Sequence, residues 1–177
     1  MAKRQSLKEL QERLAQRLTA ARSEGVTASW LAVEVGAQNC LIPLVQSGEI
    51  FPWMPVQGVP YTKPWYLGVA NLRGGLFGVV DLAALLLDAS GLAAVADRVS
   101  SESRLVSLHA ALGVNAVLWI DRLLGLRGGA SFVRVDEAPA QSPRFVTRLL
   151  VDAQGTAWQE LDLQALVQEP TFLAIAA

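Results

Sequence analysis

The side chains best suited to chemistry in this chain are an amide and a guanidinium next to two glycines. Asn71 and Arg73 precede Gly74 and Gly75, between two apolar runs that predict two strands joined by a tight turn. The glycines are expected to supply the positive φ angles of this turn. Two rigid strands would hold Arg73 at an exposed tip, where binding residues are often carried. The predicted chemistry is ionic recognition of a partner, and the simpler interpretation is a hairpin with a solvated arginine.

Residues for catalysis or metal binding are scarce. His109 is the only histidine and Cys40 the only cysteine, so neither a Ser-His-Asp triad nor a zinc site has local support. We expect Cys40 to be buried and unreactive, and His109 to be a structural residue in an apolar strand. The sequence contains no phosphate-binding loop and no dinucleotide fingerprint, and most of its acidic residues are scattered singly. We therefore expect no enzyme, no cofactor and no metal; a hydrolase that uses His109 is the alternative.

The composition indicates a soluble protein with a large apolar interior. Of the 177 residues, 52% are hydrophobic and 18% are charged, and the net charge is −1. No basic segment favours nucleic acid as a partner. The longest membrane-like run, residues 105–120, is shorter than the ~20 residues of a spanning helix. With a charged N-terminal segment in place of a signal peptide, we expect a cytoplasmic protein without membrane insertion.

The first 25 residues predict a separate amphipathic helix. Ser6 and Glu9 form a capping box, and Gly25 ends the helical pattern. Leucines at positions 7, 10, 14 and 18 form one narrow apolar stripe. We expect this stripe to dock on the protein's own domain; a seam for a helix of another chain is the sharper alternative. The predicted organisation is an N-terminal helical extension, 1–25, and one domain, 26–177.

The remainder of the chain predicts short strands separated by turn residues. The expected strands are 30–35, 40–45, 49–51, 69–73, 76–81, 104–109, 114–126, 145–151 and 156–161. Short helices are expected at 82–87 and 162–168, a loop or a frayed helix at 88–103, and a loop at 127–143. Eight or nine short strands with few helices indicate a barrel or a sandwich.

The fifteen residues from Gly68 to Leu82 closely resemble the G-V-x-N-x-R-G-x-x-x-P-V-x-D-L signature of CheW-like chemotaxis coupling proteins. The matching residues are Gly68, Val69, Asn71, Arg73, Gly74, Val79, Asp81 and Leu82. Gly78 stands where most of the family has proline. Together with the preceding Trp65-Tyr66-Leu67, this departure resembles the PilI-type branch, which acts in twitching motility.

The resemblance implies a mainly β fold of two SH3-like five-stranded barrels that share a core, with the N-terminal helix and a short C-terminal helix added. It also implies a non-catalytic adaptor that couples a methyl-accepting chemoreceptor to a CheA-like histidine kinase, here in type IV pilus signalling. One surface would dock the regulatory domain of the kinase, and another would accept the cytoplasmic tip of the receptor. By their match to the motif, Arg73 and Asn71 would lie at the partner-binding surface, with Glu49 as a weaker candidate, while Gly74 and Gly75 would shape the turn.

Aromatic side chains near the prolines leave a second function open. Trp53, Met54, Trp65, Tyr66 and Phe77 surround the proline-rich segment and the hairpin. We expect most of them to fill barrel cores. A small-molecule-binding β-barrel, with Trp53, Trp65 and Phe77 lining its pocket, is the alternative to the adaptor.

Overall fold

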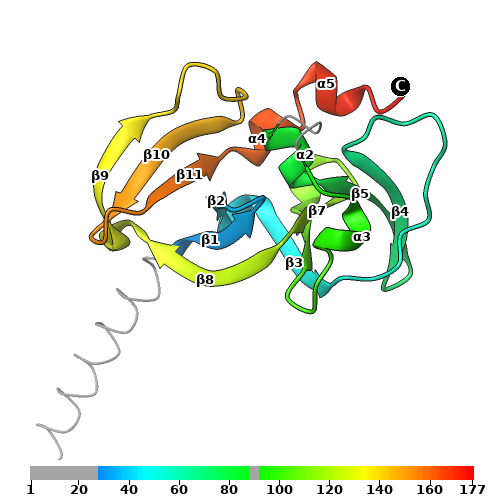
Figure 1. Cartoon of the computed structure of the whole chain (residues 1–177), viewed down its shortest axis with the longest axis horizontal. Coiled ribbons are helices and arrows are strands. Elements are labelled where there is room, and N and C mark those ends of the chain that lie inside the picture. Colours follow the sequence, from blue (N-terminus) through cyan, green and yellow to red (C-terminus); the bar gives the residue numbers. More distant parts are fainter. Residues whose placement is uncertain (1–27, 88–91) are drawn as a thin grey trace, which may run out of the picture.

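Two β-sheets form the framework of the protein (Figure 1). The computed structural model describes residues 28–87 and 92–177, so the expected N-terminal helix lies outside the described residues. The strands are β1 Ala28–Val35, β2 Gln38–Pro43, β3 Ser47–Pro52, β4 Tyr66–Leu72, β5 Gly75–Asp81, β6 Arg104–Leu108, β7 Ala116–Ile120, β8 Arg122–Gly128, β9 Phe132–Glu137, β10 Val146–Asp152 and β11 Ala157–Leu161. The helical segments are η1 Leu44–Gln46, α2 Leu82–Leu86, α3 Val95–Arg98, η3 Ala110–Leu112, η4 Gly129–Ser131, α4 Leu163–Leu166 and α5 Pro170–Leu173. Of the helices described, none is long and apolar enough to cross a membrane.

Each sheet mixes parallel and antiparallel pairs. The larger sheet has the order β8-β1-β2-β11-β10-β9, and the smaller has the order β3-β6-β7-β5-β4. The parallel pairs are β2 with β11 and β5 with β7, and the other neighbours are antiparallel. The predicted fold, mainly β with two joined barrels, is confirmed, except that one sheet has six strands in place of the five expected.

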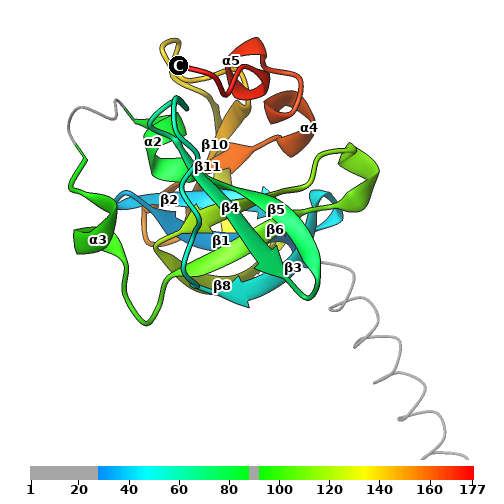
Figure 2. The same cartoon turned by 90° about the vertical axis from the view of Figure 1, so that its right-hand side faces the viewer.

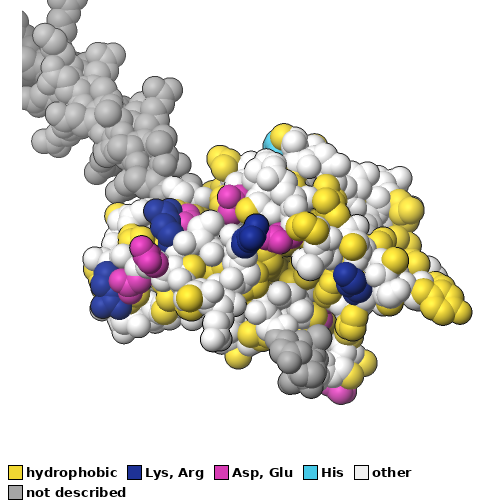
Figure 3. Space-filling model, turned by 90° about the horizontal axis from the view of Figure 1, so that it is seen from above, with side chains coloured by type: hydrophobic (Ala, Val, Ile, Leu, Met, Phe, Trp, Pro, Cys, Tyr) yellow, Lys and Arg dark blue, Asp and Glu magenta, His cyan; other side chains and the backbone are white. Residues whose placement is uncertain are grey.

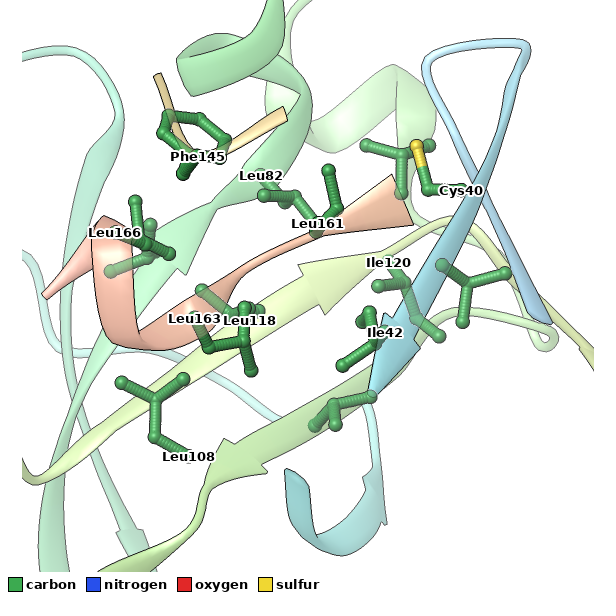
Figure 4. Close-up of a cluster of buried hydrophobic side chains, with 14 of the residues drawn as sticks. Cys40, Ile42, Leu82, Leu108, Leu118, Ile120, Phe145, Leu161, Leu163 and Leu166 are labelled. Atoms are coloured by element: carbon green, nitrogen blue, oxygen red, sulfur yellow. The ribbon is translucent and has the colours of Figure 1, made fainter. Parts of the chain in front are cut away.

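A shared core lies between the two sheets and explains why neither barrel is separate from the other (Figure 4). Successive residues of β7 point to opposite faces, and every residue of this strand is buried. Leu118 and Ile120 point into the shared core, while Val117 and Trp119 point into the interior of the smaller barrel. Burial of each such side chain stabilises the fold by roughly 1.5–3 kcal/mol.

The smaller barrel closes through backbone contacts between β4 and the segment that follows β3. Gln57 and Val69 exchange two backbone hydrogen bonds, of 2.8 and 2.9 Å. Gly68 precedes Val69 with a φ of +133°, and a Cβ at this position would lie 2.1 Å from the carbonyl oxygen of Gln57. Only glycine allows the two backbones to approach this closely. This contact brings the two edges of the five-stranded sheet together.

Three expectations about elements are wrong. The predicted strand 114–126 is two strands, because the chain passes from one sheet to the other at Asp121, whose N–H donates to the carbonyl of Glu34 at 3.0 Å. The predicted loop 127–143 contains β9, whose alternating pattern was outweighed by the glycines and prolines that flank it. Pro43 ends β2, so the predicted strand 40–45 is too long, and η1 follows. Helix α3 lies in the segment expected to be a loop or a frayed helix, whereas α5 lies beyond the predicted C-terminal helix.

Candidate partner-binding site

The tip of the β4–β5 hairpin is a two-residue turn made by Arg73 and Gly74. Their φ angles are +48° and +85°, which is the pattern of the type I′ turns common in such hairpins. Leu72 and Gly75 form the last strand pair, so the expectation of a positive φ at Gly75 is wrong. The side-chain oxygen of Asn71 accepts a 2.9 Å hydrogen bond from the N–H of Gly74. Asn71 therefore supports the backbone that presents Arg73.

The structure brings Arg73 together with Glu49, the weaker candidate from the sequence. A guanidinium nitrogen of Arg73 lies 2.7 Å from a carboxylate oxygen of Glu49, and the two side chains are 76% and 57% exposed. Glu49 belongs to β3, at the opposite end of the strand order from β4 (Figure 2). The curl of the sheet is what places the two charges side by side.

A bulge in β3 positions Glu49. The pairing of β3 with β6 shifts between Ser47 and Ile50, and the N–H of Glu49 donates to the hydroxyl of Ser107 at 2.8 Å. Bulges of this kind redirect a side chain at the rim of a barrel. Ser107 is buried on the neighbouring strand, so the backbone beneath Glu49 has a fixed anchor. The sequence provided no signal for this role of Ser107.

Apolar side chains accompany the ion pair. The Arg73 guanidinium carbon lies 5.7 Å from the centre of the Phe51 ring. Ile50 follows Glu49 in β3, Leu76 lies opposite Asn71 in β5, and both are exposed. Arginine and exposed apolar residues are both common in protein-binding surfaces. Sequence reasoning missed Ile50 and Leu76, because an alternating pattern does not show which apolar residues stay at the surface.

The ion pair contributes little to the stability of the fold. Exposed pairs are worth about 0–1 kcal/mol, because water and salt screen them. The face of the molecule seen in Figure 3 carries basic and acidic side chains in small mixed groups, with no large area of one sign. An arginine held in place but weakly paired can exchange its carboxylate for one from a partner.

Three further residues of the hairpin region have structural roles. Asp81 caps α2 by accepting hydrogen bonds from the N–H groups of Ala83 and Ala84, at 3.1 and 3.3 Å. A Cβ at Gly78 would lie 3.0 Å from the ring of Tyr66. The Tyr66 ring occupies this space, which accounts for a small residue at the position where most of the family has proline.

A buried charge cluster joins the hairpin to the other barrel. The two terminal nitrogens of Arg98 donate to the carboxylate of Asp81 at 2.7 and 3.1 Å, and one of them lies 3.5 Å from Asp121. The carboxylate of Asp121 accepts a hydrogen bond from the N–H of Gly36, in the turn between β1 and β2. The Arg98 guanidinium carbon also lies 4.4 Å from the centre of the Trp119 ring. Arg98 thus connects β5 of one sheet with a turn of the other.

A second charge cluster stabilises the six-stranded sheet around Glu160. Its buried carboxylate accepts hydrogen bonds from Trp30, Thr147 and Arg148, with the Arg148 Nε at 2.6 Å. Burial by itself would raise the pKa of Glu160. The hydrogen bonds from Arg148 and Trp30 and the charge of Arg148 outweigh burial, so the pKa of Glu160 is lowered.

The residues considered for catalysis do not assemble a site. Burial raises the pKa of the Cys40 thiol to about 12, which keeps it protonated. The expectation of His109 inside an apolar strand is wrong: β6 ends at Leu108, and exposed His109 accepts a hydrogen bond from the N–H of Ala111 at the start of η3. Within residues 28–87 and 92–177, no group of three or more His, Cys, Asp and Glu side chains is arranged to hold a metal.

The pocket expected for a small molecule does not form from the predicted aromatic residues. Trp65 is buried in the shared core, where its ring stacks on Phe172 at 5.7 Å. Trp53 and Phe77 instead pack against the interior of the smaller barrel. These three side chains therefore pack on two different cores and do not line one common pocket.

Two joined barrels form the framework, and an exposed ion pair links the β4–β5 hairpin to β3 at the surface. The model of the CheW-like domain family matches residues 29–171, and the chain belongs to this family. A probable chemotaxis protein CheW of Rhizobium etli is 36% identical over 56 residues, which are 32% of this chain and 36% of that protein. The chemotaxis protein CheW of Rhizobium meliloti matches with the same identity and coverage, so the match spans about a third of either relative.

A solved structure has the same fold. The scaffolding protein TtCheW from Thermoanaerobacter tengcongensis superimposes with a TM-score of 0.61, over 77% of this chain and 89% of that chain. The identity is 17%, so this comparison supports the architecture and says nothing of the partners of the present chain.

Proposed function

We propose that this protein is a non-catalytic adaptor that couples a methyl-accepting chemoreceptor to a CheA-like histidine kinase. The observation that carries the proposal is the CheW-like domain match, together with the exposed pair between Arg73 of the signature hairpin and Glu49 of β3. The names of the relatives, chemotaxis protein and scaffolding protein, support the same role. The adaptor would bind the kinase regulatory domain and the cytoplasmic tip of the receptor, and would control the kinase through geometry.

The proposed pathway is twitching motility by type IV pili, with Gly78 and the preceding Trp65-Tyr66-Leu67 as its support. Removing the protein from its host should then abolish twitching and leave flagellar swimming unchanged. Loss of swimming with normal twitching would place the protein in a flagellar pathway. We further propose that residues 1–25 are an extension of the domain at 26–177; the family match, which begins at residue 29, supports this division.

Reversal of the charge at Arg73 tests the binding role. In the variant Arg73→Glu, the free energy of unfolding should differ from that of wild type by no more than about 0.5 kcal/mol, because the side chain is exposed. Kinase autophosphorylation, in a mixture of receptor, adaptor and kinase, should lose its control by the receptor, because close charged contacts at interfaces are worth several kcal/mol. The control is Arg144→Glu, at another exposed arginine, which should leave kinase control intact.

Exchanging the charges of Arg73 and Glu49 separates the binding of a partner by Arg73 from its ion pair with Glu49. The double variant Arg73→Glu with Glu49→Arg restores an ion pair within the adaptor but keeps the wrong charge at the hairpin tip. Kinase control should stay lost in this variant. Full recovery in the double variant, or normal control in Arg73→Glu alone, would show that Arg73 does not bind a partner.

A further inference from the structure

Strand β9 leaves one of its edges without a neighbouring strand in the part of the chain that the structure describes. It is the last strand in the order of the six-stranded sheet and pairs only with β10. Figure 1 shows β9 at the outer end of the molecule, on the left. An open strand edge presents backbone N–H and C=O groups that can pair with another strand.

The side chains of β9 do not block such pairing. Val133 and Val135 lie on one face of the strand and are 71% and 55% exposed. Val135 is opposite Leu150 of β10, which is buried in the interior of the larger barrel. The apolar face of β9 therefore continues the face that β10 turns toward this interior.

The charges on either side of Val135 are complementary to those of a second, antiparallel copy of β9. Arg134 and Asp136 lie on the opposite face from the valines, and their side chains form an ion pair with an Nε–Oδ2 distance of 2.9 Å. If a second β9 runs antiparallel, with the two-fold axis at Val135, each Arg134 lies opposite an Asp136. Opposite charges in directly opposed positions stabilise an antiparallel pair, whereas like charges destabilise it.

We propose that β9 pairs with β9 of a second copy of this chain and forms a two-fold symmetric homodimer. The new sheet would run β10-β9-β9-β10, with Val135 against Val135 at the axis and two Arg134–Asp136 pairs across the interface. Such an isologous contact uses both open edges and closes at two copies. Strands of six residues make a small interface, so the dimer should form only at elevated protein concentration.

Analytical ultracentrifugation of the full chain over a wide concentration range tests the proposal. The average mass should rise from 19.0 kDa toward twice that value. Arg134→Asp places like charges opposite each other at two symmetric positions and should weaken the dimer about tenfold or more. Asp136→Arg should do the same. The double variant Arg134→Asp with Asp136→Arg should restore the dimer, because it inverts the pattern and keeps the net charge.

The control is Arg144→Asp, an exposed charge change outside β9, which should leave the association unchanged. A thermal melt of every variant shows whether the fold is intact. If Arg134→Asp does not fold, Val135→Lys replaces it, because this variant places two ammonium groups together at the axis and should also give a monomer. A wild-type chain that stays monomeric, or a dimer that survives these changes, would overturn the proposal. So would a monomer whose β9 amides resist hydrogen exchange, since another segment would then cover the edge.

Discussion

Replacement of Arg98 by methionine should destabilise the protein strongly. Arg98→Met removes both hydrogen bonds to Asp81, and the side chains of Arg98 and Asp81 are only 12% and 4% exposed. Loss of one partner from a buried ion pair costs about 3–5 kcal/mol, because the remaining charge is poorly solvated. Asp81 keeps two backbone N–H groups at the start of α2, so we expect the lower end, about 3 kcal/mol. For a domain of this size, this loss lowers the melting temperature by roughly 6–12 °C.

A double-mutant cycle separates the energy of the Arg98–Asp81 ion pair from that of the cap that Asp81 makes on α2. Asparagine caps a helix as well as aspartate does, so Asp81→Asn removes the charge and keeps the bonds to Ala83 and Ala84. In this background Arg98→Met should cost about 2 kcal/mol less, because the most buried carboxylate of the cluster, that of Asp81, is no longer charged. The measurement is urea unfolding, followed by tryptophan fluorescence, of wild type, both single variants and the double variant.

The matched control for this cycle is Arg122→Met. Arg122 pairs with Glu34 at 2.6 Å, but its side chain is 44% exposed, so its removal should destabilise the protein much less than the removal of Arg98. Free energies for Arg98→Met and Asp81→Asn that add within about 0.5 kcal/mol would refute the reasoning, because the two side chains would then act independently.

Two more changes have defined outcomes. Gly74→Val should lower the free energy of unfolding by about 1–3 kcal/mol in a thermal melt, because a β-branched residue resists a φ of +85°; unchanged stability would contradict the turn. Glu160→Gln should destabilise the protein at neutral pH and progressively less in acid. Because the pKa of Glu160 is lowered in the folded protein, its stabilising effect is present above its ordinary pKa. This effect is lost as the pH falls through the pKa of the folded state. A difference between wild type and Glu160→Gln that does not change with pH would contradict the charged network around this residue.

The sequence alone determined the features that depend on neighbouring residues. The positive φ of Gly74 and the cap made by Asp81 on α2 follow from backbone preferences and short-range hydrogen bonds. The continuous run of apolar residues in β7 is typical of a strand that is buried on both faces. These signals extend over a few residues, so one segment of sequence contains all of the information. The family signature added the pairing of barrels that strand counting by itself does not provide.

Tertiary structure decided which distant residues meet. Glu49 lies beside Arg73 because the smaller sheet curls until its two ends approach each other, and no local pattern encodes the degree of curl. Arg98 reaches Asp81 and Asp121 from α3, and no local pattern in the sequence indicates these two contacts. The sequence predicts a loop at β9, because this half-exposed edge strand has only a short alternating pattern between flanking glycines and prolines. Contacts across the chain depend on how whole sheets pack, and the free energy of that packing is spread over many residues.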